Sequence, residues 1–270
     1  VTVLSEGDEG YRRYDKPVAD IFRLDGYKTY KAYFMLNSED KEIGDTGDNR
    51  FFEGNFNLEM YPSETVRLTF PEGSTVAEIA VILEEGGVCT AEEFREQANN
   101  AALLSEYGFD IETPENRAFA LEGYLFPDTY DFYVGEGAED AIRRFLKNTQ
   151  KKLGEDILER CAQTGYTLDE ILAIASVIQE ETGYVSEMGK VSSVLHNRLA
   201  SPEYPKLQCD ATIFYLENSV KPYVSEEKYA TFTELYSTYK CNGIPEGPIT
   251  NPGLDAINAA LNPEDTPYYF

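Results

Sequence analysis

Apolar residues recur at helical spacing in several stretches of the chain, and the clearest lies near the middle. Residues 168–182 place most of their apolar side chains on one broad face. Thr167 followed by Glu170 has the spacing of a capping box, and Gly183 is a natural stop, so we expect a helix over 167–182. The same period predicts helices over 76–85, 91–102, 138–154, 186–200 and 252–261.

The acidic end of this predicted helix carries the first candidate for chemistry. Glu181 follows Ile174 by seven residues and Ile178 by three, so it projects on the apolar side, whereas Glu180 points the other way. A carboxylate on an apolar face is costly unless it is paired or keeps its proton. A carboxylic acid that is still protonated near neutral pH can act as a general acid. The ordinary alternative is a solvated glutamate at a helix end, which spacing alone favours.

Residues 1 to about 60 show little helical periodicity. Two stretches, 27–35 and 51–58, alternate in the manner of short strands, and residues 45–49 are typical of a turn or mobile loop. A further alternating run, 65–70, predicts a strand that leads through a Pro-Glu-Gly-Ser turn into the first helix.

Three parts follow from this order of elements. Residues 1–60 form a strand-rich N-terminal segment, 61–115 a compact αβ unit, and 116–270 a larger part in which clusters of Gly, Pro, Asn and Tyr separate helices. We therefore expect an α+β chain with a sizeable core.

The charge balance narrows the range of partners. With 49 acidic against 23 basic residues, the net charge of −26 argues against nucleic acid or an anionic membrane surface. The chain has 20 tyrosines, whose rings suit both a core and a sugar-facing groove because the hydroxyl stays wet. No stretch of 18 apolar residues occurs that would span a membrane.

Cysteine and histidine usage argues against a structural metal. Cys89, Cys161, Cys209 and Cys241 are widely scattered without a CxxC pair, and His196 is the single histidine. The four cysteines could form disulfides if the protein is exported, but we favour the interpretation that they are free, half-buried thiols. We expect neither a metal nor an organic cofactor.

Polar and aromatic clusters follow one another along the last part of the chain. They occupy residues 121–130, 187–198, 207–212, 236–240 and 243–253. The third, if extended, would place Gln208, Asp210 and Thr212 on one side. The last is rich in proline and glycine, and rigid loops often position binding groups. Taken singly, each cluster is also explained by a rigid linker, by helix-end contacts or by packing.

Taken together, six runs carry a specific resemblance. They are EGYLFPDTY, ILAIASVIQEETG, KVSSVLHNRL, LQCDATIFY, YSTY and GIPEGPITNPGLDAINAALNP. In order and spacing they resemble the YceG-like family, whose best-known member is an endolytic murein transglycosylase. The resemblance covers 118–270 closely, and PEGSTVAEIAVILEEGGV is similar to that family's LysM-like peptidoglycan-binding subdomain. It implies an α+β fold: a small LysM-like αβ module within 61–115, then a mostly helical catalytic domain over 116–270. That domain would be lysozyme-like or lytic-transglycosylase-like, with a few short strands.

The resemblance also assigns roles to single residues. The family's helix commonly ends Glu-Lys-Glu-Thr with the second glutamate as catalytic acid, so Glu181 matches the acid and Gln179 replaces the first glutamate. The family's Leu-Gln-Ser-Asp-Pro-Thr appears here with Cys209 and Ala211 as its changed positions. We expect nine further side chains to orient the sugar and the acid: Glu122, Tyr124, Asn197, Gln208, Asp210, Thr212, Thr238, Tyr239 and Asn251.

The activity that the resemblance implies is endolytic cleavage of peptidoglycan. The bond between N-acetylmuramic acid (MurNAc) and N-acetylglucosamine (GlcNAc) would break with Glu181 as acid and then base, leaving a 1,6-anhydroMurNAc end. Such an enzyme would trim or terminate nascent glycan strands. One alternative is a muramidase-type hydrolase with Asp210 or Glu122 as a second carboxylate. Another is a non-catalytic peptidoglycan-binding scaffold. A protease using Cys209 and His196 is disfavoured, because their spacing says nothing about pairing.

Location and partners follow from the implied substrate. We expect the protein at the extracytoplasmic face of the bacterial plasma membrane, bound to peptidoglycan glycan strands and working beside cell-wall synthases, with no role for nucleic acid. Family members are usually tethered by a single N-terminal span, so we expect an anchor before Val1 and a further strand after Phe270.

Overall fold

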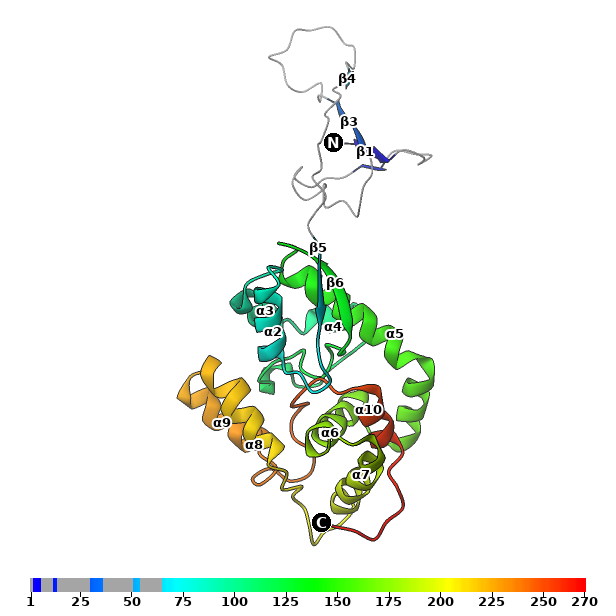
Figure 1. Ribbon diagram of the computed structural model, residues 1–270, viewed down its shortest axis with the longest axis vertical. Helices are drawn as coiled ribbons and strands as arrows, with labels where there is room; N and C mark the ends of the chain where they lie inside the picture. Colours follow the sequence, from blue (N-terminus) through cyan, green and yellow to red (C-terminus); the bar gives the residue numbers. More distant parts are fainter. Residues whose placement is uncertain (1, 6–11, 14–29, 36–50, 54–64) are drawn as a thin grey trace. The chain divides into compact units, whose positions relative to one another are not determined.

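The computed structural model describes residues 2–5, 12–13, 30–35, 51–53 and 65–270 (Figure 1). The chain divides into two compact units, Val1–Ser63 and Glu64–Phe270. All described helices belong to the second unit and each unit contains strands, so the chain is α+β, as the sequence predicts.

The first unit contains an antiparallel sheet with strand order β2-β1-β3-β4. The strands are β1 (Thr2–Ser5), β2 (Arg12–Arg13), β3 (Tyr30–Met35) and β4 (Phe51–Glu53). Strand β1 pairs with β3 from Thr2 opposite Tyr33 to Ser5 opposite Tyr30. Both β3 and β4 fall within stretches predicted as strands, whereas the turn predicted at 45–49 lies outside the described residues.

The second unit begins with β5 (Thr65–Thr69) and α2 (Val76–Glu85), both where the sequence predicts them. Thr75 and Glu78 form a capping box, which satisfies free backbone N–H groups at the start of α2. In the turn before it, Gly73 has φ +83°, and a Cβ there would lie 2.6 Å from a carboxylate oxygen of Glu180. Only glycine meets both conditions, so this turn packs directly against Glu180.

The single helix predicted over 91–102 is wrong, because the structure has two. Helix α3 (Ala91–Gln97) ends early and α4 (Ala102–Ser105) follows. Asn99 lies between them and donates its side-chain amide to the backbone carbonyl of Arg95 at 3.1 Å. Asparagine that bonds to nearby backbone competes with helix formation, which accounts for the break.

Strand β5 pairs with β6 (Thr129–Tyr133), which begins inside the stretch 121–130 interpreted as a turn. The pair is antiparallel, with Thr65 opposite Tyr133 and Thr69 opposite Thr129. The two strands come from either side of the predicted boundary at 115/116, which therefore lies inside the second unit. The LysM-like module stays a prediction.

A cluster of aromatic rings joins this strand pair to α5 (Ala138–Thr164). The ring centroid of Phe145 lies 4.9 Å from that of Phe70, 4.5 Å from Tyr130 and 5.9 Å from Phe132. Edge-to-face and tilted pairs of this kind stabilise a core beyond simple burial. Gly154 interrupts α5 with φ +54°, at the residue where the predicted helix over 138–154 ends. The helical segment from there to Thr164 was not predicted.

Helix α6 (Leu168–Glu181) is the centre of the remaining structure, and it matches the prediction. Every side chain from Ile171 to Ile178 is buried, because α5, α7, α8 and α10 all pack against it (Figure 1). The elements after it are α7 (Val185–Leu199), α8 (Ala211–Tyr215), a π-helical turn η2 (Leu216–Val220), η3 (Lys221–Tyr223), α9 (Glu226–Tyr236) and α10 (Leu254–Leu261). Of these, α7 and α10 are predicted, and the helices within 211–236 are not.

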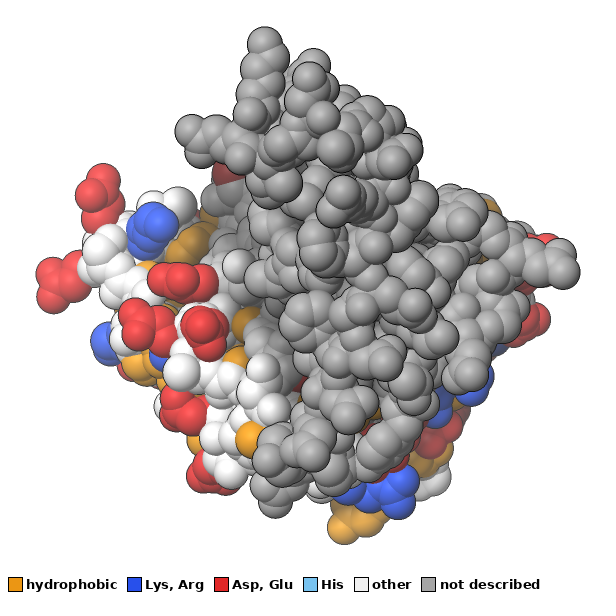
Figure 2. All heavy atoms as spheres, turned by 90° about the horizontal axis from the view of Figure 1, so that it is seen from above, with side chains coloured by type: hydrophobic (Ala, Val, Ile, Leu, Met, Phe, Trp, Pro, Cys, Tyr) orange, Lys and Arg blue, Asp and Glu red, His pale blue; other side chains and the backbone are white. Residues whose placement is uncertain are grey.

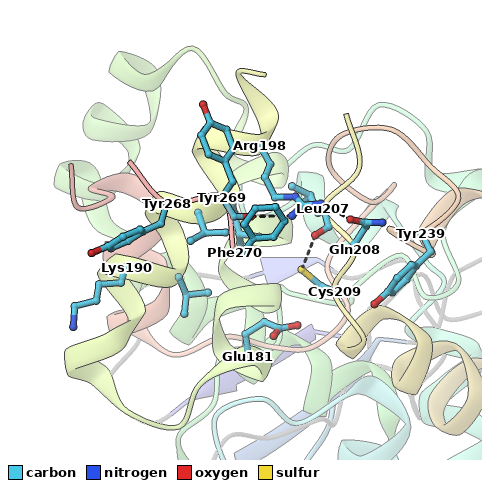
Figure 3. Close-up of a pocket in the computed structure, with 13 residues that line it drawn as sticks. Glu181, Lys190, Arg198, Leu207, Gln208, Cys209, Tyr239, Tyr268, Tyr269 and Phe270 are labelled. Carbon is cyan, nitrogen blue, oxygen red and sulfur yellow. Dashed lines mark hydrogen bonds between the residues drawn. The ribbon is translucent and has the colours of Figure 1, made fainter. Parts of the chain in front are cut away.

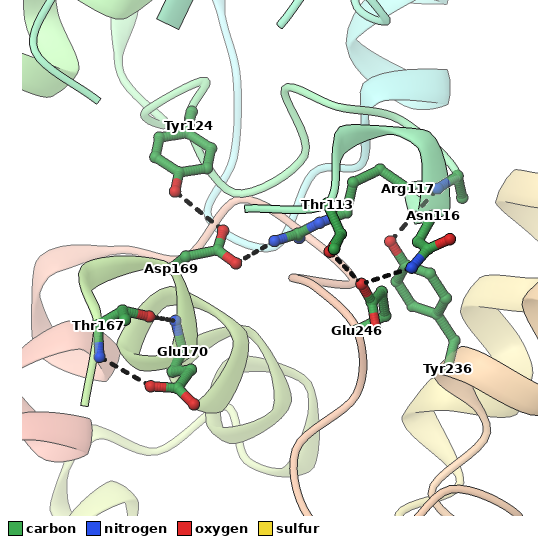
Figure 4. A network of polar contacts seen from close by, with 10 residues as sticks. Thr113, Asn116, Arg117, Tyr124, Thr167, Asp169, Glu170, Tyr236 and Glu246 are labelled. Carbon is green, nitrogen blue, oxygen red and sulfur yellow. Dashed lines mark hydrogen bonds and ion pairs between the residues drawn. The ribbon is translucent and has the colours of Figure 1, made fainter. Parts of the chain in front are cut away.

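A buried ion pair fixes the first turn of α6 (Figure 4). The guanidinium of Arg117, which follows the short helix η1 (Pro114–Asn116), contacts Asp169, and Tyr124 donates its hydroxyl to the same carboxylate at 2.9 Å. The side chains of Arg117 and Asp169 are only 2% and 17% exposed. Two Arg117 nitrogens, Nε and Nη1, have no hydrogen-bond partner among the described residues, so Asp169 is the group that compensates the charge.

The surface of the described chain reflects its acidic composition. Figure 2 shows Asp and Glu side chains gathered along one described flank, with few Lys or Arg side chains among them. Across residues 65–270, no helix combines the length and the apolar character that a bilayer crossing requires.

The buried ion pair yields a test of stability. Asp169→Asn should lower the free energy of unfolding by about 3–5 kcal/mol, because it leaves the Arg117 charge uncompensated in the core. The matched change Asp131→Asn breaks an exposed ion pair with Arg67 and should cost far less, because both charges are solvated. Urea unfolding followed by circular dichroism measures both, and equal losses would contradict the role given to Asp169.

Candidate active site

The C-terminal end of α6 places two glutamates in front of a turn in the chain. Thr182 has extended backbone angles and ends the helix directly after Glu181. Glu180 and Glu181 are exposed as residues, unlike the buried residues from Ile171 to Ile178, although their carboxyl groups are partly buried. The last two carboxylates of α6 therefore lie outside the core, at the surface.

Two hollows share Glu181, which lines both of them, and Figure 3 shows the larger one. The larger hollow, of about 700 Å³, is also lined by Lys190, Arg198, Cys209, Tyr239 and Tyr268, among others. The smaller hollow, of about 240 Å³, is also lined by Glu78, Glu180, Asp210, Phe214 and Thr250, among others. A polymer lying through both hollows would pass the Glu181 side chain.

The surroundings of Glu181 favour its protonated form. Burial raises the pKa of its carboxyl group, and the nearby negative charge of Asp210 raises it further. The backbone N–H of Ala211 and the thiol of Cys209, which also lies 3.6 Å from the Leu207 carbonyl, act in the opposite direction, because hydrogen bonding favours the carboxylate. The net effect is a raised pKa, which suits a general acid.

The loop that faces Glu181 is braced from behind. The Cys209 N–H donates to the Thr238 hydroxyl at 2.8 Å, and the Thr212 hydroxyl donates to the Cys209 carbonyl at 2.8 Å. Gln208 has φ +56°, a left-handed backbone conformation that is costly for a residue with a side chain. The Gln208 N–H donates to the Thr238 carbonyl at 3.1 Å, and its side-chain oxygen accepts from Arg198. These contacts hold the strained loop in place.

The extended conformation considered for residues 207–212 does not occur. Asp210 has helical angles and α8 begins at Ala211, so Gln208, Asp210 and Thr212 do not share one side. Gln208 lines the larger hollow and Asp210 the smaller one, where its carboxylate accepts from the Tyr239 hydroxyl at 2.7 Å. Thr212 is fully buried behind the loop.

Glu122 and Asn251, predicted to bind sugar, are instead completely buried. Glu122 accepts from the Val76 N–H at 3.0 Å and from the Asn251 amide at 2.9 Å. Asn251 also donates to the Ser74 carbonyl at 2.9 Å and accepts from the Leu125 N–H at 2.8 Å. Burial raises the pKa of Glu122 well above its usual range. The pair ties three loops together and does not reach either hollow.

The remaining predicted residues divide in the same way. Tyr239 lines the larger hollow, whereas Thr238 is fully buried and braces Cys209. Tyr124 is buried at Asp169, twelve residues before Glu181 on α6, which is roughly 18 Å along a helix. Asn197 donates to the carbonyls of Thr266 and Tyr268 at 2.7 and 2.8 Å, so it holds the C-terminal segment. Of the nine, the structure brings Gln208, Asp210 and Tyr239 to the hollows with Glu181.

Several residues of the hollows were missed by the sequence analysis. Helical spacing placed Glu180 on the side of α6 opposite the apolar face. In the structure that side faces the turn at residues 71–75 and not open solvent. Burial therefore raises the pKa of Glu180 as well. Glu78 and Phe214 belong to elements far apart in sequence, and α8 itself was not predicted. For Phe214, an aromatic residue just after a polar run was the one available signal.

The cysteine thiols and the grouping of acidic side chains bear on chemistry other than acid catalysis. All four cysteines are free thiols, as the sequence interpretation favoured, and Cys161 and Cys209 are buried. Burial raises the pKa of Cys209 to about 12, so its thiol stays protonated beside Glu181. Within residues 65–270, no three His, Cys, Asp or Glu side chains are grouped so as to hold a metal ion.

The sequence model of the YceG-like family matches residues 53–270, which is most of the chain. The chain belongs to the YceG-like family. An endolytic murein transglycosylase of Bacillus subtilis (strain 168) is 29% identical to it over 212 residues, or 76% of this chain and 58% of that protein. One from Streptococcus pneumoniae serotype 2 (strain D39 / NCTC 7466) is 29% identical over 220 residues, or 74% of this chain and 39% of that protein.

A solved structure supports the same family. The crystal structure of a yceG-like protein from Listeria monocytogenes, at 26% sequence identity, superposes with a TM-score of 0.64. The match covers 76% of this chain and 68% of that one. This YceG-like chain spans about half the length of the two named relatives.

The neighbours of Glu181 yield a test by titration. Asp210→Asn should lower the pKa of Glu181 because it removes a negative charge, and Cys209→Ala should raise it because it removes a donor. Carboxyl ¹³C NMR of a glutamate-labelled protein measures both shifts. Asp156→Asn, at an exposed position of α5, is the matched control and should change nothing. A Glu181 pKa that is unchanged or higher in Asp210→Asn would contradict this electrostatic arrangement.

Proposed function

We propose that this protein is a peptidoglycan lytic transglycosylase that cleaves the MurNAc-β-1,4-GlcNAc bond within glycan strands and leaves a 1,6-anhydroMurNAc end. One observation carries the proposal: a carboxyl group whose surroundings favour its proton lies where two hollows meet. The family and the names of the two relatives, both endolytic murein transglycosylases, support it.

In the first step, protonated Glu181 donates its proton to the glycosidic oxygen while the bond from that oxygen to C1 of MurNAc breaks. The leaving GlcNAc regains a free hydroxyl. The N-acetyl group of MurNAc supplies the electron pair that stabilises C1, so a second enzyme carboxylate is not required. Positive charge that develops at C1 is favoured by the negative charge of Asp210 close to Glu181.

In the second step, Glu181 is a carboxylate and acts as the base. It removes the proton from the C6 hydroxyl of MurNAc, and O6 attacks C1 to close the 1,6-anhydro ring. The attack is intramolecular, so it benefits from proximity. No water enters, and Glu181 ends the cycle with its proton restored. The Cys209 thiol and the Ala211 N–H favour the carboxylate during this half of the cycle.

The main rival is hydrolysis of the same bond, with Asp210 helping a water molecule to attack. Asp210 is exposed, lines the smaller hollow and is oriented by the Tyr239 hydroxyl, which favours considering it as a second carboxylate. Glu122 is not available for this role because it is fully buried. The products separate the two reactions: hydrolysis leaves a reducing MurNAc end, whereas transglycosylation leaves an anhydro end.

We further propose that the protein acts on the outer side of the plasma membrane, where peptidoglycan lies, and that its cuts trim or terminate nascent strands. An N-terminal anchor and a cell-wall synthase as partner stay predictions. The proposed activity needs no cofactor, because the proton, the electron pair and the nucleophile all come from Glu181 and the substrate.

The catalytic role of Glu181 is tested by products. With purified peptidoglycan, Glu181→Gln should lower the rate of anhydroMurNAc formation by about 10²–10⁴-fold, the usual contribution of a general acid. The adjacent change Glu180→Gln makes the same substitution one residue away and should cost far less. Mass spectrometry of the released fragments gives both rates, and unfolding curves check that the variants fold.

Three results would contradict the proposal. Reducing ends labelled by ¹⁸O from water would establish the hydrolase. Binding of peptidoglycan by wild type without any cleavage would establish the scaffold. A Glu180→Gln variant as inactive as Glu181→Gln would remove the distinction between the two glutamates.

A further inference from the structure

The two hollows that meet at Glu181 differ in charge. The larger hollow contains the side chains of Lys190 and Arg198 in its wall. The smaller hollow has no Lys or Arg in its wall, and three carboxylates besides Glu181 line it. Of the two cations, Lys190 is exposed and contacts Glu187, which is not part of the wall, at 3.1 Å, whereas Arg198 has no acidic partner among the described residues.

Arg198 makes the larger hollow more positive than an ordinary surface arginine would. The residue is 6% exposed, yet it forms no salt bridge with any described residue. Its guanidinium donates to the Lys206 carbonyl at 3.0 Å, to the Tyr269 carbonyl at 2.9 Å and to the Gln208 side-chain oxygen. These acceptors are neutral, so the buried positive charge is hydrogen-bonded but not neutralised.

The smaller hollow has the opposite character. Glu78, Glu180 and Asp210 bring carboxylates to its wall, and Phe214 places an aromatic side chain there that is 62% exposed. Thr250 is 4% exposed and its hydroxyl has no hydrogen-bond partner of normal geometry among the described residues, although it lies near Glu180. Exposed aromatic rings and hydroxyl-accepting carboxylates suit a neutral sugar, whereas an anionic group would be repelled.

The two sugars of peptidoglycan differ in the same respect. MurNAc carries a lactyl group that ends in a carboxylate or in a peptide stem, and GlcNAc is neutral and smaller. The larger hollow has a volume typical of ligand pockets, and the smaller hollow lies below that range.

We infer that the charge contrast sets the direction of the glycan strand: the MurNAc that is cleaved lies in the larger hollow with its lactyl side facing Arg198 and Lys190, and the GlcNAc that leaves lies in the smaller hollow against Phe214. This inference rests on the proposed function. It adds which side of Glu181 holds which sugar, and it assigns recognition of the lactyl carboxylate to the α7 cations.

A pair of single-charge changes tests the direction. Lys190→Gln removes one positive charge from the larger hollow, and Asn218→Asp adds one negative charge to the smaller hollow, where Asn218 is exposed. Lys228→Gln, at an exposed position of α9, controls for net charge. The substrates are the tetrasaccharide GlcNAc-MurNAc-GlcNAc-MurNAc with free lactyl carboxylates and its bis-methylamide, in which those carboxylates are neutral.

The measured quantity is the ratio of kcat/KM for the anionic and the neutral tetrasaccharide. We expect Lys190→Gln to lower this ratio about threefold, the size of an exposed charge interaction, and Asn218→Asp and Lys228→Gln to leave it unchanged. A ratio lowered by Asn218→Asp and not by Lys190→Gln would mean that MurNAc lies in the smaller hollow. A ratio moved by neither, or by Lys228→Gln equally, would mean that charge does not set the direction.

Calorimetry keeps this inference separate from the proposed function. In the Glu181→Gln background the tetrasaccharides stay intact, and the ratio of their dissociation constants should follow the same pattern across the three charge variants. If wild type released no anhydro product while the binding ratios changed as expected, the chemistry would fail and the assignment of the sugars would stand. Unchanged binding ratios with normal cleavage would overturn the assignment alone.

Discussion

A buried hydrogen-bonded pair, Glu122 with Asn251, holds the loops on which the candidate site depends. It joins the start of α2 and residues 121–125 to the loop of residues 243–253. That loop also receives the polar groups of α6, because Ser176 and Gln179 accept the N–H groups of Ile249 and Gly253 at 3.0 Å. Both residues of the pair are fully buried, so each polar atom there has to be satisfied within the protein. The last turn of α6 is therefore held between the turn at residues 71–75, which packs against Glu180, and the loop of residues 243–253, which binds Gln179.

This arrangement explains how one helix serves both the core and the site. Its first turn is held by Arg117 and Asp169, its middle is buried on all sides, and its last turn brings Glu181 to the hollows. The carboxyl group of a general acid has to be desolvated enough to keep its proton and accessible enough to contact a polymeric substrate. Glu181 meets both conditions, because its carboxyl group lies among Cys209, Asp210 and Ala211 while its side chain remains exposed.

The sequence predicted the elements with strong local signals. Apolar periodicity placed α2 and α6 within a residue of their observed bounds, for α6 together with a predicted capping box, and the order of motifs indicated the family. It did not predict β6 as the partner of β5, or the helices within 211–236, whose positions are set by tertiary packing. In the site, Asp210 and Asn251 both belong to family motifs, yet Asp210 lines a hollow and Asn251 is buried and holds the loops. That difference is one of burial, which spacing along the chain does not reveal.

The central claim is that a glycan strand passes through both hollows with its scissile bond at Glu181. A crystal structure of the Glu181→Gln protein with the GlcNAc-MurNAc-GlcNAc-MurNAc tetrasaccharide tests it most directly. We expect the oxygen between the central MurNAc and GlcNAc to lie within about 3 Å of the residue 181 side chain, with that MurNAc in the larger hollow near Arg198 and that GlcNAc in the smaller hollow near Phe214. A strand bound away from residue 181, or one that occupies a single hollow, would contradict it.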